Sequence, residues 1–148
     1  MPESLSSSGA LSMRGLFAGV DASASAMGGE RLRMTVASEN LAHANDTRRL
    51  ADGKPYARQR VVFEAAMDEQ GRLNGQVASD AVVSPKYQTH YDPSHPHADA
   101  QGMVMTPDIS PILELTDLLT ASKAYDANAN AARGLLRMHE NALRLGQD

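Results

Sequence analysis

Apolar residues recur at helical spacing at both ends of the chain. Over residues 12–47, apolar positions follow one another three or four residues apart, which is typical of one face of a helix. Gly28 and Gly29 interrupt this stripe, and each costs about 1 kcal/mol in a helix interior. The pattern therefore predicts either one helix with a weak middle or two helices that meet at the glycines. Asn45-Asp46-Thr47 then ends the helical pattern.

The C-terminal stripe is longer and more regular. Ser110 and Pro111 favour a helix start, and Gly146 favours a helix end. Spacing of three and four residues sustained over this length is typical of a coiled-coil seam. Only a serine and a histidine break the apolar character of the stripe. Its members are Leu115, Leu118, Ser122, Tyr125, Ala129, Ala132, Leu136, His139 and Leu143.

Turn signals and prolines exclude a long helix from the middle of the chain. Residues 56–64 and 73–83 read as short strands that pair as a hairpin, and residues 92–102 read as a loop. We predict a mainly α fold with a small β region, in which long N- and C-terminal helices pair in coiled-coil fashion around a short β-hairpin/loop middle segment. The predicted parts are a disordered tail (1–11), a first helix (12–47), the middle segment (48–109) and a last helix (110–148).

Composition removes several classes of function. The 148 residues include no cysteine, which excludes a disulfide framework, a thiolate zinc site and a cysteine nucleophile. The formal net charge of −4 argues against nucleic-acid binding, which relies on basic surface. The first residues lack the apolar core of a secretory signal peptide, and no stretch approaches the length of a membrane span.

The histidine-rich loop is the one place that suggests metal chemistry. His90, His95, His97 and Asp99 have zinc-ligand side chains, so a small metal-binding enzyme is one alternative reading. Their spacing matches no familiar site, however. We favour a structural loop that Pro93 and Pro96 stiffen and in which the polar side chains make contacts.

Other polar residues also have structural readings. Glu114 and Asp117 share one face of a helix start and could do acid/base chemistry in a cleft, but a solvated or interface role is favoured. Asn40 and Asn45 lie near a helix end, where asparagine usually caps or bonds backbone. No nucleophile elbow or phosphate loop is present. We therefore expect no catalytic residue, metal, cofactor or small-molecule substrate.

Residues 36–47, 53–63 and 91–109 carry motifs in a fixed order. Together these three segments resemble the flagellar basal-body rod and hook family, most closely its proximal rod members. Residues 36–47 are similar to the family's N-terminal signature, and residues 53–63 to the segment that follows it. Residues 91–109 give the longest match, which continues through residues 114–128. Three positions depart from the family pattern, and they are His43, Asp108 and Lys123.

The resemblance implies a structural subunit of the proximal rod. Such subunits would assemble into a helical tube that transmits torque from the membrane ring to the hook. The implied partners are other rod proteins, copies of the same protein, the type III export apparatus and the membrane ring of the basal body. The implied location is the periplasm-spanning rod, reached from the cytoplasm without a cleaved signal peptide. A coiled-coil adaptor unrelated to flagella is a further alternative.

Family-motif and stripe positions are the candidate subunit-interface residues. They are Asn40, Leu41, Ala42, Asn45, Tyr56, Arg58, Tyr91, Pro93, His95, Pro96, Asp99, Gly102, Pro107, Leu115, Leu118, Tyr125, Asn128 and Leu136.

Overall fold

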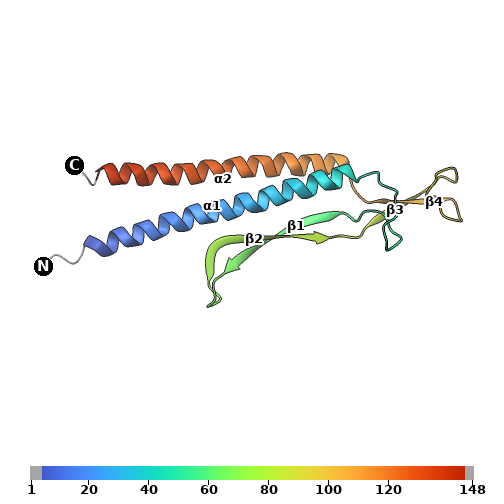
Figure 1. Cartoon of the computed structure of the whole chain (residues 1–148). Helices are drawn as coiled ribbons and strands as arrows, with labels where there is room; N and C mark the ends of the chain where they lie inside the picture. The colour runs from blue at the N-terminus through green and yellow to red at the C-terminus, as the bar shows by residue number, and fades with distance from the viewer. Residues whose placement is uncertain (1–4, 146–148) are drawn as a thin grey trace. The chain divides into compact units, whose positions relative to one another are not determined.

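The computed structural model describes residues 5–145. A helix stands at each end of this range, and four strands lie between the helices in sequence (Figure 1). The order is α1 (Leu5–Ala42), β1 (Gln59–Met67), β2 (Leu73–Val83), β3 (Tyr87–Tyr91), β4 (Met103–Pro107) and α2 (Pro111–Leu145).

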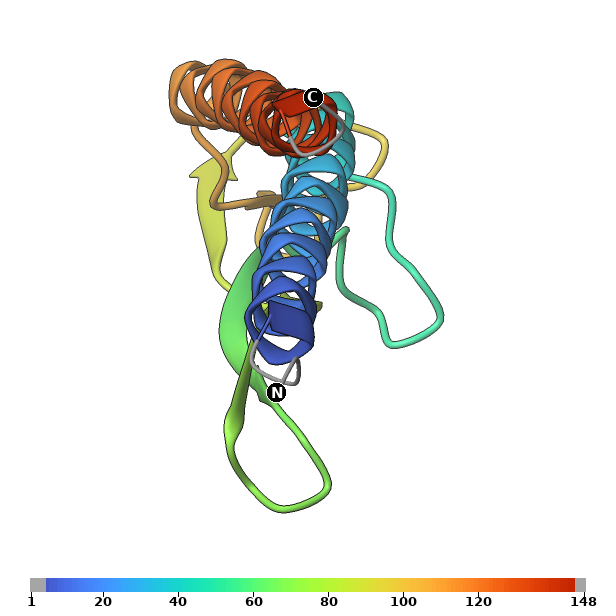
Figure 2. The ribbon, with the colours of Figure 1, turned by 90° about the vertical axis from the view of Figure 1, so that its left-hand side faces the viewer.

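The N-terminal stripe forms one helix, α1, drawn as an unbroken coil in Figure 2. Gly28 and Gly29 do not divide it, so the one-helix alternative is correct. The helix begins at Leu5, inside the segment for which the sequence predicted a disordered tail, while residues 1–4 of that tail lie outside the described range. The helix tolerates Gly29 because the position is buried: a Cβ there would lie 2.4 Å from the Phe63 ring.

β1 and β2 pair in a two-stranded sheet, as the sequence predicted. A tight turn joins them: the Asp68 backbone N–H donates to the Arg72 carbonyl at 2.8 Å. The Asp68 carboxylate accepts the backbone N–H groups of Gln70 and Arg72. Gly71 has a φ of +74°, which favours glycine. Asp68 and Gly71 therefore fix the turn.

β3 and β4 form a second, antiparallel pair that the sequence did not predict. Tyr87 stands opposite Pro107 and Tyr91 opposite Met103. Val104 of β4 is fully buried. The strands are short, and prolines lie close to both of them. Because proline has no backbone N–H for strand pairing, the sequence did not indicate these strands. The segment between the strands, residues 92–102, is a loop as expected.

α2 begins where Ser110 and Pro111 indicated. The backbone N–H of Glu114 donates to the Ser110 carbonyl at 3.1 Å, which makes Ser110 the N-cap residue. The helix continues to Leu145. Gly146, the predicted end signal, lies outside the described residues. No helix in the described part of the molecule is long and apolar enough to cross a membrane.

The chain divides into two compact units. Unit 1 comprises residues 1–31, 63–79 and 123–148, and unit 2 comprises residues 32–62 and 80–122. The buried apolar side chains among the described residues all belong to unit 2. They are Val36, Ala37, Ala44, Pro55, Val104, Pro107, Ile109 and Ala121.

The predicted mainly α, coiled-coil fold was wrong. Four strands in the described range form two sheets, and the terminal helices do not form a clear coiled coil. A seam would bury the apolar stripe of α2. Instead Leu115, Leu136 and Leu143 are about half exposed, at 49%, 50% and 53%. Three-four spacing shows where apolar residues align along a helix, but it does not identify what covers them.

Candidate functional site

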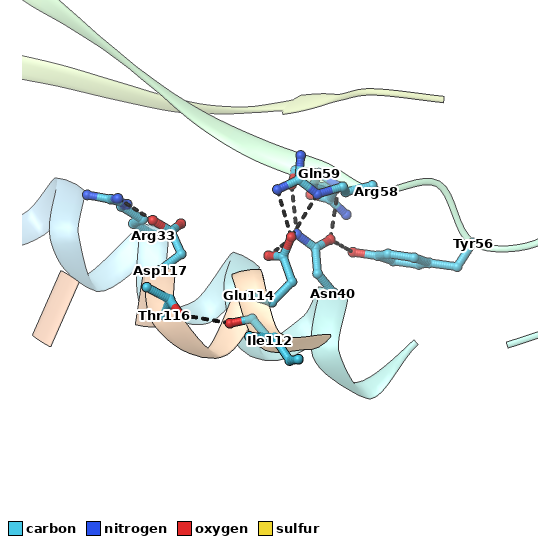
Figure 3. A network of polar contacts seen from close by, with 9 residues as sticks. All are labelled: Arg33, Asn40, Tyr56, Arg58, Gln59, Ile112, Glu114, Thr116 and Asp117. Carbon is cyan, nitrogen blue, oxygen red and sulfur yellow. Dashed lines mark hydrogen bonds and ion pairs between the residues drawn. The ribbon is translucent and has the colours of Figure 1, made fainter. Parts of the chain in front are cut away.

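A buried polar cluster in unit 2 joins three segments that are distant in sequence. It comprises Asn40 near the end of α1, Tyr56 and Arg58 just before β1, Gln59 at the start of β1, and Glu114 in the first turn of α2 (Figure 3). We call these five residues the Asn40 junction.

Asn40 is the centre of the junction and is only 1% exposed. Its Nδ2 donates to the Gln59 carbonyl at 2.8 Å and to Glu114 Oε2 at 3.0 Å. Its Oδ1 accepts the Tyr56 hydroxyl and the Gln59 backbone N–H, both at 3.0 Å. These bonds use both donor hydrogens and both acceptor lone pairs of the amide. An asparagine here therefore connects α1 to both other segments with no polar atom left over.

Glu114 brings a negative charge into the same buried space. Its side chain is 2% exposed, and Oε1 lies 2.7 Å from both Nε and Nη2 of Arg58. The Arg58 side chain is 37% exposed. A buried carboxylate without partners would cost several kcal/mol, so the Arg58 pair and the Asn40 bond are what make the position tolerable. Of the two roles that the sequence suggested for Glu114, the solvated one was wrong, because the side chain is buried within the subunit.

A second ion pair lies in the same unit, one helical turn along α2. Arg33 of α1 and Asp117 of α2 pair through Nη2 and Oδ1 (Figure 3). Glu114 and Asp117 therefore each meet a separate arginine.

Tyr56 lies at the rim of the junction. Its ring stacks on the His43 ring with the centroids 4.5 Å apart and the planes 17° apart. Burial of the phenol raises its pKa, and the nearby negative charge of Glu39 adds to this effect. The hydroxyl therefore stays protonated and keeps donating to Asn40.

The loop of residues 92–102 is held by aspartates rather than by its prolines alone. Asp99 Oδ1 accepts the backbone N–H groups of Gln101 and Met103 at 2.9 and 2.8 Å. Asp92 accepts the hydroxyl and the backbone N–H of Ser94, and the hydroxyl bond lowers the pKa of Asp92. Each aspartate thus stabilises a turn.

Gly102 closes this loop. Its φ is +75°, and a Cβ there would lie 2.9 Å from the Tyr91 ring and 3.1 Å from Pro93. Both the backbone conformation and the close approach require glycine. Tyr91 itself is 70% exposed.

The histidines of the loop have partners other than a metal. His97 Nδ1 lies 2.9 Å from the Thr47 hydroxyl, and His95 Nδ1 accepts the His97 backbone N–H at 3.1 Å. Within residues 5–145 no group of three His, Cys, Asp or Glu side chains is arranged to hold a metal ion.

The structure gathers only part of the predicted site. Asn40, Tyr56 and Arg58 meet in the junction. Asn128 bonds Ala124 in its own helix, and Asn45 lies exposed beyond the end of α1. The remaining residues are distributed as follows: Leu41, Ala42, Tyr91, Pro93, Pro96, Asp99, Leu115 and Leu136 are exposed, His95, Leu118 and Tyr125 are half-buried, and Gly102 and Pro107 are buried.

Sequence reasoning missed Gln59 and the buried role of Glu114. Gln59 acts through its backbone, which leaves no signal in side-chain identity. Glu114 did leave a signal, since it precedes Leu118 by four residues and Ala121 by seven on one helix face. A charge in line with buried positions indicates a partner of opposite charge.

Comparison with known proteins identifies the class. No protein-family model matches this chain. A flagellar basal-body rod protein FlgC from Aquifex aeolicus is 36% identical over 80% of this chain and 88% of the relative. FlgC proteins of Borreliella burgdorferi and Bacillus subtilis are 30% and 31% identical, over 90% and 88% of this chain and 99% and 98% of the relatives.

These relatives place the chain in the class of structural components of the bacterial flagellar basal body. Within that class, the chain belongs to the family of the basal-body rod protein FlgC. The rod-subunit prediction is confirmed at this level. Neither alternative, the metal-binding enzyme or the unrelated adaptor, receives support from the comparisons.

Proposed function

We propose that this chain builds the proximal part of the flagellar rod and catalyses nothing. Copies of the chain, together with other rod proteins, form a helical tube that transmits torque from the membrane ring to the hook. The observation that carries this proposal beyond family membership is an exposed aliphatic surface at the start of α2.

This surface, which we call the α2 patch, consists of Ile112, Leu113, Leu115 and Leu119. Their side chains are 77%, 65%, 49% and 54% exposed. Ile112, Leu115 and Leu119 follow the three- and four-residue spacing that puts them on one helix face. Large aliphatic side chains gathered in two turns are typical of a protein–protein contact. We propose that neighbouring subunits cover the α2 patch.

The Asn40 junction supports this surface within unit 2. Glu114 lies inside the patch sequence but points into the junction, where Asn40 and Arg58 hold it. Its bonds fix the first turn of α2, so that the aliphatic side chains on either side are presented in one orientation. A contact that transmits torque requires such a fixed support, because a freely rotating helix start would yield under load.

Other exposed family-motif positions are proposed as secondary contacts. They are Leu41, Asn45, Tyr91, Pro93, Pro96 and Leu136. Identical subunits that join through unlike surfaces generate an open helical assembly, which is the symmetry of a tube. We place this assembly in the periplasm-spanning rod, with the type III export apparatus and the membrane ring as further partners.

Complementation of a deletion strain tests the proposal. Ile112→Asp and Leu119→Asp put a charge on the α2 patch, whereas Thr120→Asp puts the same charge at an exposed polar position of the same helix. We expect the deletion strain to be non-motile and without hooks, Thr120→Asp to restore swimming, and both patch variants to be exported but not to support hook assembly. Normal swimming of the deletion strain would refute the rod assignment, and full rescue by the patch variants would refute the patch.

A further inference from the structure

The turn-proximal end of β2 contains an asparagine whose surroundings differ from those of the other asparagines described above. Asn74 and Gly75 are both exposed. Gly75 has a φ of +79°, and nothing lies within 4 Å of the place where a Cβ would stand. The backbone nitrogen after Asn74 is therefore approached without hindrance from a side chain.

The Asn74 side chain is also held over the following backbone. Its Oδ1 accepts the Gln76 backbone N–H at 2.9 Å. This bond folds the amide towards the C-terminal side, where the Gly75 nitrogen lies, and draws electron density from the carbonyl carbon Cγ. Both effects favour attack of that nitrogen on Cγ.

We infer that Asn74 is a site of spontaneous covalent modification, at which the chain deamidates through a cyclic imide. The Gly75 nitrogen, having lost its proton to hydroxide, forms a bond to Cγ. The bond between Cγ and Nδ2 then breaks, and the leaving group takes a proton from water and departs as ammonia, which regenerates the hydroxide. Water then opens the ring at either carbonyl. One opening gives aspartate, and the other gives isoaspartate, in which the backbone runs through the former side chain.

The other described asparagines lack this combination. Asn40 is buried with every polar atom bonded, and Leu41 follows it. Asn128, Asn130 and Asn141 lie within α2, and an alanine follows each of them. Asn45 is exposed beyond the end of α1, but the residue that follows it is an aspartate, which has a Cβ. A residue with a Cβ after the asparagine hinders ring closure, and a regular helix holds the backbone nitrogen away from Cγ. Reaction is therefore expected to be selective for Asn74.

Modification at this position changes the hairpin. Either product adds a negative charge beside a turn that already contains Asp68 and Glu69. Isoaspartate also adds a backbone atom at the start of β2, which shifts the strand relative to β1, because pairing depends on a strict two-residue repeat.

Incubation of the full-length folded protein at mildly alkaline pH, followed by peptide mapping by mass spectrometry, tests the inference. The peptide containing Asn74 is expected to gain the mass difference between an amide and an acid, at a rate that rises with pH. Part of the product should accept a methyl group from S-adenosylmethionine in the presence of isoaspartyl methyltransferase. In Asn74→Gln, whose longer side chain would have to close a larger ring, both signals should be lost.

Two results would overturn the inference. One is an unchanged Asn74 peptide under conditions in which a synthetic peptide of residues 70–79 deamidates, which would show that the folded hairpin protects the site. The other is faster mass gain at another asparagine than at Asn74. A circular dichroism spectrum of Asn74→Gln that matches the wild type establishes that the variant is folded.

Discussion

Asn40 shows how much one amide group organises when it is buried and its hydrogen bonds are complete. The amide connects α1 to the start of β1 and to α2. An aspartate would place a second negative charge against Glu114, and a leucine would remove the hydrogen bonds that Asn40 makes to the Gln59 backbone and to Glu114 Oε2. Only a neutral group that both donates and accepts twice fits this position.

Replacement of Asn40 by alanine is expected to lower the free energy of unfolding by about 3 kcal/mol, because it leaves several buried polar atoms without partners. Urea denaturation followed by circular dichroism measures this loss. Asn128→Ala is the matched control, since that side chain bonds only within its own helix; we expect a change within about 0.5 kcal/mol. Equal effects of the two substitutions would contradict the central role of Asn40.

At the scale of the elements, the sequence indicated well where helices and strands lie along the chain. It indicated poorly which elements pack or pair with one another. The start of α2 at Ser110-Pro111 and the β1–β2 hairpin both follow from local signals, namely a cap and a turn. The β3–β4 pair has no local turn, since its strands are joined across residues 92–102, so pairing depends on contacts that no short window contains. The coiled-coil prediction was wrong for a related reason, because the periodicity of apolar residues does not identify the surface that covers them.

The sequence motifs single out Asn40, Tyr56 and Arg58 individually. They do not indicate that these side chains meet in one junction. Glu114 and Asn40 are 74 residues apart, and no spacing rule relates them. Polar residues near helix ends most often bond local backbone, which is why a long-range junction was not expected from the sequence.

The two adjacent glycines of α1 provide a test of element packing. Gly28 faces open space, whereas a Cβ on Gly29 would lie 2.4 Å from Phe63 and 3.3 Å from the Ser79 Cβ. Both substitutions by alanine raise helix propensity by about 1 kcal/mol, so their difference isolates the contact. Gly28→Ala is expected to raise the midpoint of thermal unfolding, and Gly29→Ala to lower it or leave it unchanged. An equal rise in both would show that α1 does not meet Phe63.

At the scale of the whole molecule, order should be unevenly distributed. The buried apolar side chains lie in unit 2, whereas the last turns of α2 in unit 1 expose Leu136, Met138 and Leu143. Regions with few buried apolar contacts open at low free energy. We therefore expect the most stable part of a free subunit to lie around the Asn40 junction.

Hydrogen exchange on the free subunit measures this distribution. We expect slow exchange in residues 103–107 and 114–122, and fast exchange in residues 136–144. Helices are marginal in water unless an apolar face is covered, so the C-terminal half of α2 should gain protection only in the assembled rod. Uniformly slow exchange along α2 in a monomer would contradict this expectation.

The separation between Asn40 and Glu114 also sets an order of events for a polypeptide that emerges N-terminus first, from a ribosome or from a narrow channel. Asn40 emerges early, but its last partner, Glu114, emerges 74 residues later, after the first three residues of α2. Until then the amide and Arg58 have no carboxylate to bind. The junction thus closes near the end of emergence, and a polypeptide truncated before Glu114 can never close it. Closure of the junction therefore requires that the first turn of α2 has emerged.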